Sequence, residues 1–471
     1  MKKLCIANKW RWIIVFLTIL QNGYCNAQKD TLLTIAQIMF LGNKITKEHI
    51  LRRELAIQEG DRINATELDR VLEWEKNKIY NLQIFVSVEY RYEYLSLDSI
   101  RIFFDIKEQW YIFPIPHLDI GDRNFNEWLR ERNADLRRLE YGMRINWRNA
   151  RGRRENLRIG LQLGFTRALG FSYFFPYINR KQTISAKYEI RFAENRDVAY
   201  QTENNKLVYL RYGDKVLRER FSTSFSIGYR KRFFDNHSLR IGWQENRVDD
   251  SVIILNPEYF LDSRNIQRYT EIEYTYRYDY RDNQIYPLKG WLFFLGLNQL
   301  GVFRNEDQHV TRFYMSISKY SFLSQQFSIE TTLKGRIATP SRQPFPTLQG
   351  LGYGGYLARG YDLYAIDAQH FGISQNTFRW KALDGKPRFK FIPIEQFRTI
   401  PIQVFLKGYT DIAYGYYEFV QPINKRLTNT LLIGYGVGVD IVTYYNTVVR
   451  IEYSFNRQNE SKFFFYLKAD I

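Results

Sequence analysis

The stretch EIEYTYRYDY, residues 271–280, alternates without a break between apolar or aromatic side chains and polar or charged ones. Because successive side chains of a β-strand point to opposite faces, Ile272 and four tyrosines share one face, and the charged residues with one threonine share the other. The same period recurs at residues 327–334, 449–455 and 463–471. A strand with one oily and one charged face needs two solvents, and a closed sheet with lipid outside and water inside supplies both. The sequence therefore predicts a transmembrane β-barrel.

The composition favours strands over helices as the membrane-crossing elements. Of the 471 residues, 17% are aromatic and 36 are tyrosine, whereas the mean hydropathy is only −0.43. After residue 27 no apolar run approaches the ~20 residues that a membrane helix needs. Tyrosine in such numbers suits aromatic girdles, where the ring lies in lipid and the hydroxyl in water. The composition thus excludes a helical membrane protein and agrees with a barrel.

Residues 1–27 have the pattern of a secretory signal peptide. Cations at positions 2, 3, 9 and 11 precede the apolar run 12–20, and small side chains in Cys25-Asn26-Ala27 mark a cleavage site before Gln28. A lipoprotein anchor at Cys25 is the alternative, disfavoured by the bulky tyrosine before it. Both cysteines lie in this segment, so the mature chain has no thiol and no disulfide.

The mature chain is strongly basic. Without the leader, 64 basic residues stand against 50 acidic ones, a net charge of +14. One interpretation is that these charges line the lumen and loops and attract anionic outer-membrane lipids; the other is a polyanion-binding surface. We expect lipids as partners and no nucleic acid.

Residues 30–108 are predicted to form a small α+β domain ahead of the barrel. Apolar periodicity indicates a strand near residues 33–40, helices around residues 50–55 and 68–79, and two further strands. Those last strands are expected at residues 84–94 and 100–106.

From Trp110 to the last residue we predict sixteen turn-separated strands, with no internal helix of note. An even number returns both ends of the barrel to the same side. The expected strands lie near residues 111–120, 140–149, 156–166, 169–178, 182–200, 206–230, 237–248, 268–281, 290–300, 310–323, 326–338, 370–380, 401–415, 431–443, 447–456 and 462–471. The predicted organisation is a signal peptide (1–27), an α+β domain (30–108) and a 16-stranded antiparallel barrel (110–471).

Short segments of the predicted α+β domain form a recognisable set. They are Phe40-Leu41-Gly42-Asn43, Ile45-Thr46, Ile50-Leu51-Arg52-Arg53-Glu54-Leu55, Glu59-Gly60-Asp61, Tyr80-Asn81-Leu82, Ile84-Phe85 and Lys107-Glu108-Gln109-Trp110. In these segments the domain resembles a POTRA domain, the periplasmic module of the BamA/TamA superfamily of outer-membrane assembly factors. That resemblance implies an outer-membrane barrel in a Gram-negative bacterium with its N-terminal module in the periplasm.

The longest interruption between predicted strands, residues 339–369, contains Arg359-Gly360-Tyr361. This triplet resembles the Arg-Gly-Phe/Tyr motif on a loop that turns back into the barrel in the same superfamily. The resemblance implies an acidic partner on the inner wall, and it points to Asp411 on the thirteenth strand and Asp440 on the next. The alternative is that Arg359 is one solvated lumen cation among many.

The same interruption contains glycines that formally match GxGxxG at Gly350, Gly352 and Gly355. A dinucleotide site needs a strand before and a helix after this motif, and neither flank fits. The glycines are interpreted instead as allowing the backbone to fold tightly in a crowded lumen.

Two prolines, Pro114 and Pro116, fall in the first predicted barrel strand. Residues two apart direct their amides to one side, so two donors are missing from one ladder. We predict a weak lateral seam between this strand and the last one, which carries Phe463, Phe465 and Leu467. The alternative is that both prolines belong to the linker before the barrel.

The resemblance implies an insertase that receives unfolded outer-membrane proteins through its POTRA-like domain and releases them through the seam. A translocator of the two-partner-secretion type, with a secreted polypeptide as its client, and a passive pore or receptor are the alternatives. Periplasmic or lipoprotein accessory subunits are further expected partners. Enzyme motifs are lacking, and the histidines show no ligand spacing, so we expect neither catalysis nor a cofactor.

Overall fold

The computed structural model describes residues 32–179, 181–232, 234–388, 400–443 and 447–468. The predicted signal peptide lies outside these ranges. No helix among the described residues is long and apolar enough to cross a membrane. The chain divides into two compact units, one comprising residues up to 43 together with 54–108, and the other comprising residues 44–53 together with 109–471.

The smaller unit contains a four-stranded sheet in the order β2-β1-β4-β3. Its strands are β1 (Leu32–Leu41), β2 (Arg62–Asn64), β3 (Phe85–Ser96) and β4 (Ser99–Glu108). Strands β1 and β4 run parallel, and helix α3 (Leu68–Tyr80) buries Leu72 and Ile79. The predicted order of strands and helices is confirmed, with the short strand β2 as an addition; the other predicted helix is α2 (Glu48–Arg52).

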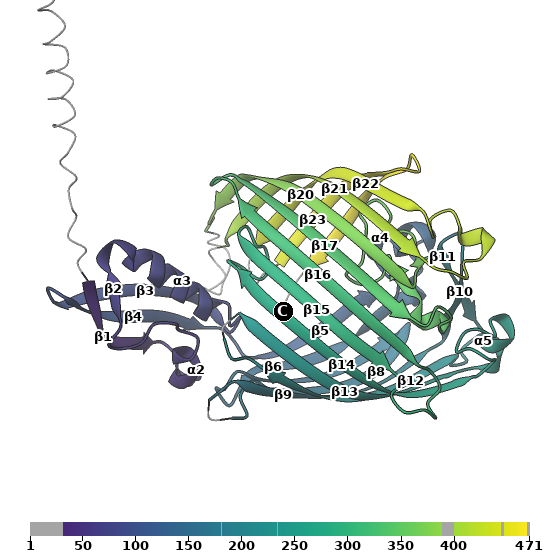
Figure 1. The fold of residues 1–471 in the computed structure, drawn as a ribbon, viewed down its shortest axis with the longest axis horizontal. Coiled ribbons are helices and arrows are strands. Elements are labelled where there is room, and N and C mark those ends of the chain that lie inside the picture. Colours follow the sequence, from purple (N-terminus) through teal and green to yellow (C-terminus); the bar gives the residue numbers. More distant parts are fainter. Residues whose placement is uncertain (1–31, 180, 233, 389–399, 444–446, 469–471) are drawn as a thin grey trace, which may run out of the picture. The chain divides into compact units, whose positions relative to one another are not determined.

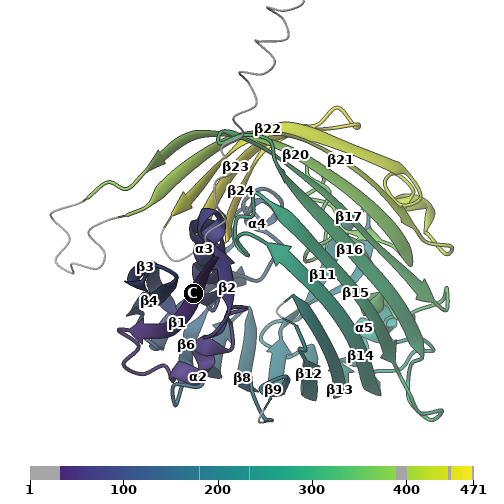
Figure 2. The same cartoon turned by 60° about the vertical axis from the view of Figure 1, so that its left-hand side comes forward.

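The larger unit is a 16-stranded antiparallel sheet that curves into a barrel, and its strands follow one another in chain order around it (Figures 1 and 2). The strands are β5 (Ile112–Ile120), β6 (Leu139–Ala150), β7 (Glu155–Gly164), β8 (Thr166–Phe175), β9 (Ile184–Asn195), β12 (Arg218–Tyr229), β13 (Asp235–Val248), β14 (Ile266–Arg281), β15 (Gly290–Leu300), β16 (Val310–Phe322), β17 (Phe327–Thr339), β20 (His370–Gly385), β21 (Ile402–Tyr416), β22 (Leu431–Thr443), β23 (Thr447–Asn456) and β24 (Ser461–Lys468). The sixteen predicted strands are thus confirmed. We call the end at which β5 begins the proximal end and the opposite one the distal end.

Two of the predicted strands were too long. The segments predicted at residues 182–200 and 206–230 each include half of a separate hairpin, formed by β10 (Asp197–Glu203) and β11 (Lys206–Arg211). Asn204 and Asn205, both at positive φ, make the two-residue turn that pairs these strands with each other rather than with the barrel.

The expectation of no internal helix was also wrong. Helix α4 (Phe125–Glu131) follows β5, and helix α5 (Asp250–Leu255) follows β13. Asn124 and Asp249 cap their first turns through side-chain oxygens. Seven and six residues are too few for a helical period to emerge from the sequence.

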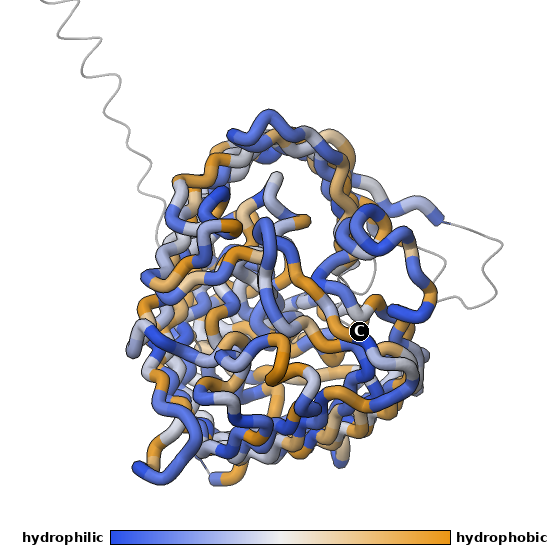
Figure 3. Tube along the Cα trace, turned by 90° about the vertical axis from the view of Figure 1, so that its right-hand side faces the viewer, coloured by the Kyte–Doolittle hydropathy of each residue, from blue (hydrophilic) through white to orange (hydrophobic). Residues whose placement is uncertain are grey.

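The alternation in residues 271–280 corresponds to the two faces of the barrel wall. Tyr274 and Tyr280 are 38% and 40% exposed on the outer face. On the inner face, Asn298 donates to Glu271 at 2.7 Å, and Arg240 lies within ion-pair distance of the same carboxylate. Apolar and polar segments alternate along the strands (Figure 3).

Candidate functional site

Residues 340–369, the loop between β17 and β20, fold back against the inner wall of the barrel; we call this segment the lumen loop. The short strands β18 (Gln349–Leu351) and β19 (Ile366–Asp367) pair within it. Buried loop side chains pack with wall residues of β20, β21 and β22 in one apolar cluster. Members of this cluster include Ala358, Tyr361, Ile366, Ala368, Phe371, Ala413 and Leu432. The loop is therefore held by a core of its own.

The Arg359 guanidinium is bound by the wall at several points. Its Nε and Nη2 donate to the two carboxylate oxygens of Asp411 at 2.9 and 2.5 Å, and its backbone N–H donates to the same carboxylate at 2.9 Å. Nη1 donates to Thr377 Oγ1 at 3.0 Å, and the cation lies 4.0 Å from the ring centre of Tyr409. Asp411 is fully buried and Arg359 is 7% exposed. This bidentate geometry is the strongest form of an arginine–carboxylate contact.

Gly360 and Tyr361, the two residues after Arg359, also contact the barrel wall directly. Gly360 has φ +89°, and a Cβ there would lie 2.8 Å from the carbonyl oxygen of Phe455. A Cβ on Gly434 of β22 would lie 1.9 Å from the Arg359 carbonyl oxygen. The hydroxyl of Tyr361 donates to Gln458 at 2.6 Å. Two glycines thus permit the backbone contact between loop and wall.

Two carboxyl groups of the lumen loop, those of Asp362 and Asp367, have pKa values above the ordinary one for aspartate. Burial, reinforced by the nearby Glu452 carboxylate, raises the pKa of Asp362 well above its usual range. Tyr466 of β24 hydrogen-bonds to that carboxyl through its hydroxyl. Burial also raises the pKa of Asp367 to about 7.

Asp440 does not face Arg359 as the resemblance implied. Its carboxylate instead forms an ion pair with Lys407 at 2.7 Å and accepts hydrogen bonds from Arg450 at 2.9 Å and from the Tyr286 hydroxyl at 2.9 Å. The register partner of Asp440 on β21 is Phe405, six residues before Asp411, so Asp440 lies beside Lys407 and Arg450 instead.

Glu452 of β23 is the acidic residue that sequence reasoning missed. It lies 4.0 Å from Arg359 and 2.6 Å from Lys407, and it is fully buried. Three cations and three carboxylates, from the lumen loop and from β21 to β23, therefore form one balanced cluster. The sequence could have indicated part of this cluster. Lys407 and Asp411 lie an even number of residues apart on one strand, so their side chains must point to the same face.

Tyr286 was a second residue whose contact the sequence did not reveal. It stands in the turn between β14 and β15, whose sequence at residues 282–291 resembles a hairpin turn of the same superfamily. The side chain reaches Asp440 and packs on Phe405 at a ring distance of 4.7 Å. The proximal turn is thereby joined to the charge cluster.

The glycine-rich part of the lumen loop lacks the flanks of a nucleotide site. Strand β18 covers only Gln349–Leu351 and the described residues after it continue as turns, not as a helix. A Cβ on Gly352 would lie 2.1 Å from the Tyr364 carbonyl oxygen. Tight backbone contact accounts for the glycine at this position.

Strands β5 and β24 are the two edges of the sheet, and no ladder joins the described residues of one to those of the other. Pro114 and Pro116 both lie within the continuous ladder between β5 and β6. A proline cannot donate, so this ladder is compatible with both prolines only where their nitrogens face the open edge. The prolines thus belong to the first barrel strand rather than to a linker.

Helix α4 covers part of the facing edge. With its amide oriented so that both groups are satisfied, Asn126 donates to Phe463 O and accepts from Phe465 N, each at 3.3 Å. Arg130 donates to Phe463 O at 3.4 Å. These side chains occupy backbone groups of β24 that a neighbouring strand would otherwise bind. Leu467, on the same strand, is 71% exposed.

The segment leading into α4 is tied to the lumen loop. Arg123 donates to the carbonyl oxygens of Leu363 and Tyr364 at 3.1 and 2.6 Å. Asn124 donates to the Asp362 carbonyl oxygen at 2.7 Å. The edge of β24, the helix and the lumen loop therefore form one hydrogen-bonded assembly.

A POTRA-like module and a 16-stranded barrel with an inserted loop define the class of outer-membrane polypeptide transport and assembly proteins. The Omp85 superfamily domain matches residues 149–386, and the POTRA domain described as "Surface antigen variable number repeat" matches residues 33–109. The chain belongs to the Omp85 superfamily. Its members are in general transport or assembly factors with outer-membrane or secreted polypeptides as clients.

Solved structures share the fold at low identity. BamA from Haemophilus ducreyi lacking POTRA domains 1–3 is 14% identical, with 92% of this chain and 83% of that chain covered and a TM-score of 0.51. CdiB from Escherichia coli is 10% identical, with 93% and 74% covered and a TM-score of 0.53. No curated protein matches the chain in sequence.

Proposed function

We propose that this protein inserts β-barrel clients into the outer membrane through the seam between β5 and β24. The observation that carries the proposal is that no backbone hydrogen-bond ladder joins the described residues of the two edge strands, β5 and β24. Unpaired strand edges bind extended polypeptides by β-augmentation, since each exposed N–H and C=O gains a partner. The proximal end would face the periplasm, where the POTRA domain receives the client.

The state of the two edges supports a lateral route. Pro114 and Pro116 remove two hydrogen-bond donors from the β5 edge. Each hydrogen bond that cannot form lowers the stability of a closed β5–β24 seam by about 0.5–1.5 kcal/mol. On the β24 edge, the peptide groups at Phe463 and Phe465 are held by side chains of α4, which a client strand could replace. The free energy of insertion would come from the client's own strand pairing and from burial of its apolar face in lipid.

The lumen loop has a supporting role in this proposal. The contact between Arg359 and Asp411 locks the loop across the lumen, and Gly360 and Tyr361 fit it to the wall. A loop folded into the lumen narrows an axial path and favours the seam as the exit. The loop also supports α4, so its position would bear on how firmly the β24 edge is covered.

The seam can be tested by crosslinking, because the mature sequence has no cysteine. Ile112→Cys and Leu467→Cys place thiols on the outer face at the proximal ends of β5 and β24, where the two strands run in opposite directions. Joining them with a short bis-maleimide should stop insertion of barrel clients into the outer membrane, measured by pulse-chase proteomics. Ile145→Cys with Ile159→Cys, exposed partners across the β6–β7 ladder, is the matched control. Normal insertion with the seam permanently joined would refute the lateral route.

A secretion translocator is the second candidate, favoured by one feature. The segment that lies against the inner wall is a loop rather than a wall strand, so its movement would widen an axial path. Depletion separates the candidates: a general loss of barrel proteins supports the insertase, and the loss of one secreted polypeptide supports the translocator. Loss of solute uptake alone would support a passive pore.

A further inference from the structure

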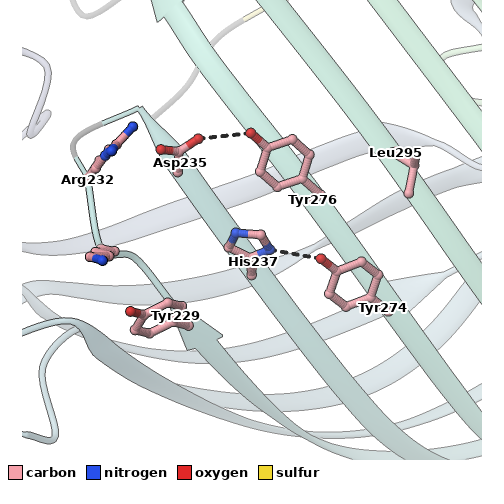
Figure 4. Close-up of a pocket in the computed structure, with 8 residues that line it drawn as sticks. Tyr229, Arg232, Asp235, His237, Tyr274, Tyr276 and Leu295 are labelled. Carbon is pink, nitrogen blue, oxygen red and sulfur yellow. Dashed lines mark hydrogen bonds between the residues drawn. The ribbon is translucent and has the colours of Figure 1, made fainter.

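A recess on the outer face of the barrel lies near its proximal end, beside the turn between β12 and β13 (Figure 4). Tyr229 and His237 are register partners across these strands, and Tyr276 of β14 is the partner of His237 on the other side. Tyr229 and Tyr274 are 44% and 38% exposed. Four aromatic rings from three strands thus share one exposed patch at the level where barrels carry an aromatic girdle.

Hydrogen bonds fix three of these four rings in place. The hydroxyl of Tyr276 donates to Asp235 at 2.8 Å, and Tyr274 Oη lies 2.8 Å from His237 Nδ1 (Figure 4). The rings of His237 and Tyr276 stand 4.8 Å apart. The polar atoms of the recess therefore keep a defined position without a ligand, which lowers the entropic cost of binding one.

Charges of both signs border the aromatic patch. Lys231 and Arg232 lie in the turn, fully in solvent reach, and neither forms an ion pair with any carboxylate in the described part of the chain. Asp235 stands at the start of β13 on the same side (Figure 4). A pair of cations beside one carboxylate is complementary to a ligand that carries a phosphate and an ammonium group.

An apolar track leads from the recess toward the middle of the barrel. The partners Ile227 and Leu239 follow Tyr229 and His237 on the outer face, and Phe225 and Ile241 follow them. These four side chains are 43–49% exposed. Acyl chains lying along this track would bury that surface, as they do on the lipid face of any barrel.

We propose that this recess binds a phospholipid of the inner leaflet that has an ethanolamine headgroup. Lys231 and Arg232 hold the phosphate, the ammonium group donates to Asp235 and lies against the tyrosine faces, and the acyl chains follow the track of Ile227 and Leu239. A quaternary choline headgroup has no N–H and cannot donate to Asp235. The site therefore distinguishes the two headgroups.

Native mass spectrometry of the full-length protein tests this. The protein is exchanged in detergent with equimolar phosphatidylethanolamine and phosphatidylcholine, and the lipids that remain bound are counted. We expect preferential retention of phosphatidylethanolamine. Lys231→Ser with Arg232→Ser should weaken retention of both lipids, by up to about fivefold for each exposed phosphate contact that is removed. Asp235→Asn should reduce the preference for ethanolamine and leave total binding largely intact.

The matched control is Arg153→Ser with Lys181→Ser, which removes two exposed cations from other proximal turns. Heat-modifiable migration on gels establishes that each variant is folded. Equal lipid retention in the Lys231/Arg232 and control variants would overturn the phosphate site. Equal retention of the two headgroups by the unmodified protein, or a preference for choline, would overturn the assignment of ethanolamine.

Discussion

Replacing Arg359 with alanine should release the lumen loop from the barrel wall. Asp411 is fully buried, and the substitution removes the guanidinium that neutralises it. Removing one partner of a buried ion pair costs about 3–5 kcal/mol, because the other charge is left without compensation. At about 1.4 kcal/mol for each factor of ten, the undocked population should rise at least about 100-fold.

The same loop provides an internal control. Arg342 pairs with Glu258 and Asp262, but all three side chains are more than half exposed. Exposed pairs contribute only about 0–1 kcal/mol, so Arg342→Ala should change loop docking by less than about fivefold. Arg359→Lys retains the charge but not the bidentate geometry, and it should fall between the two variants.

Hydrogen exchange of amides in residues 350–365, read by mass spectrometry on the protein in nanodiscs, measures the undocked population directly. Chymotrypsin cleavage after the loop tyrosines gives a second reading. If Arg359→Ala left both signals unchanged, or if Arg342→Ala raised them equally, the argument that the buried pair locks the loop would fail.

Three further outcomes are expected. Gly434→Ala should raise exchange in the lumen loop, because its Cβ would overlap a loop carbonyl oxygen, whereas Gly372→Ala on β20 meets no atom within 4 Å and should behave as the unmodified protein. Asp367 has a folded-state pKa raised to about 7 from an ordinary 3.8, so its contribution to loop docking is complete below about pH 4 and is lost as the pH rises through 7; Asp367→Asn should flatten the pH dependence of exchange, and an unchanged profile would contradict the assignment. Asn126→Ala should speed exchange of the Phe465 amide, whose N–H donates to the Asn126 side chain, and protection equal to that of the unmodified chain would show that α4 does not cover this edge.

The strands of the barrel were predictable because two solvents impose one strict period on them. A ten-residue alternation such as residues 271–280 fits no other element, and the same period recurs at residues 327–334, 449–455 and 463–471. The hairpin of β10 and β11 was not separated from the wall in the prediction, because β10 begins two residues after β9 ends and β11 lies directly before β12. Its paired asparagines at residues 204–205 were the local signal of a turn.

The candidate site was only partly accessible from sequence. Period-two parity places Asp411, Asp440 and Glu452 on inward faces, but which of them meets Arg359 depends on the stagger between strands and on the path of the loop. Neither quantity is local. Helix α4 was not predicted for a different reason: it has only seven residues, and its Asn126 and Arg130 bind a strand edge that is remote in sequence.

The lumen loop docks on side chains from three different strands of the barrel wall. Arg359 donates hydrogen bonds to Thr377 on β20 and to Asp411 on β21, and Asp362 of the same loop accepts one from Tyr466 on β24. If the pairing of any of these strands slipped by one residue, the side chain that contacts the loop would point to the outer face of the barrel. The loop can therefore make all of these contacts only when β20, β21 and β24 are paired in their native register.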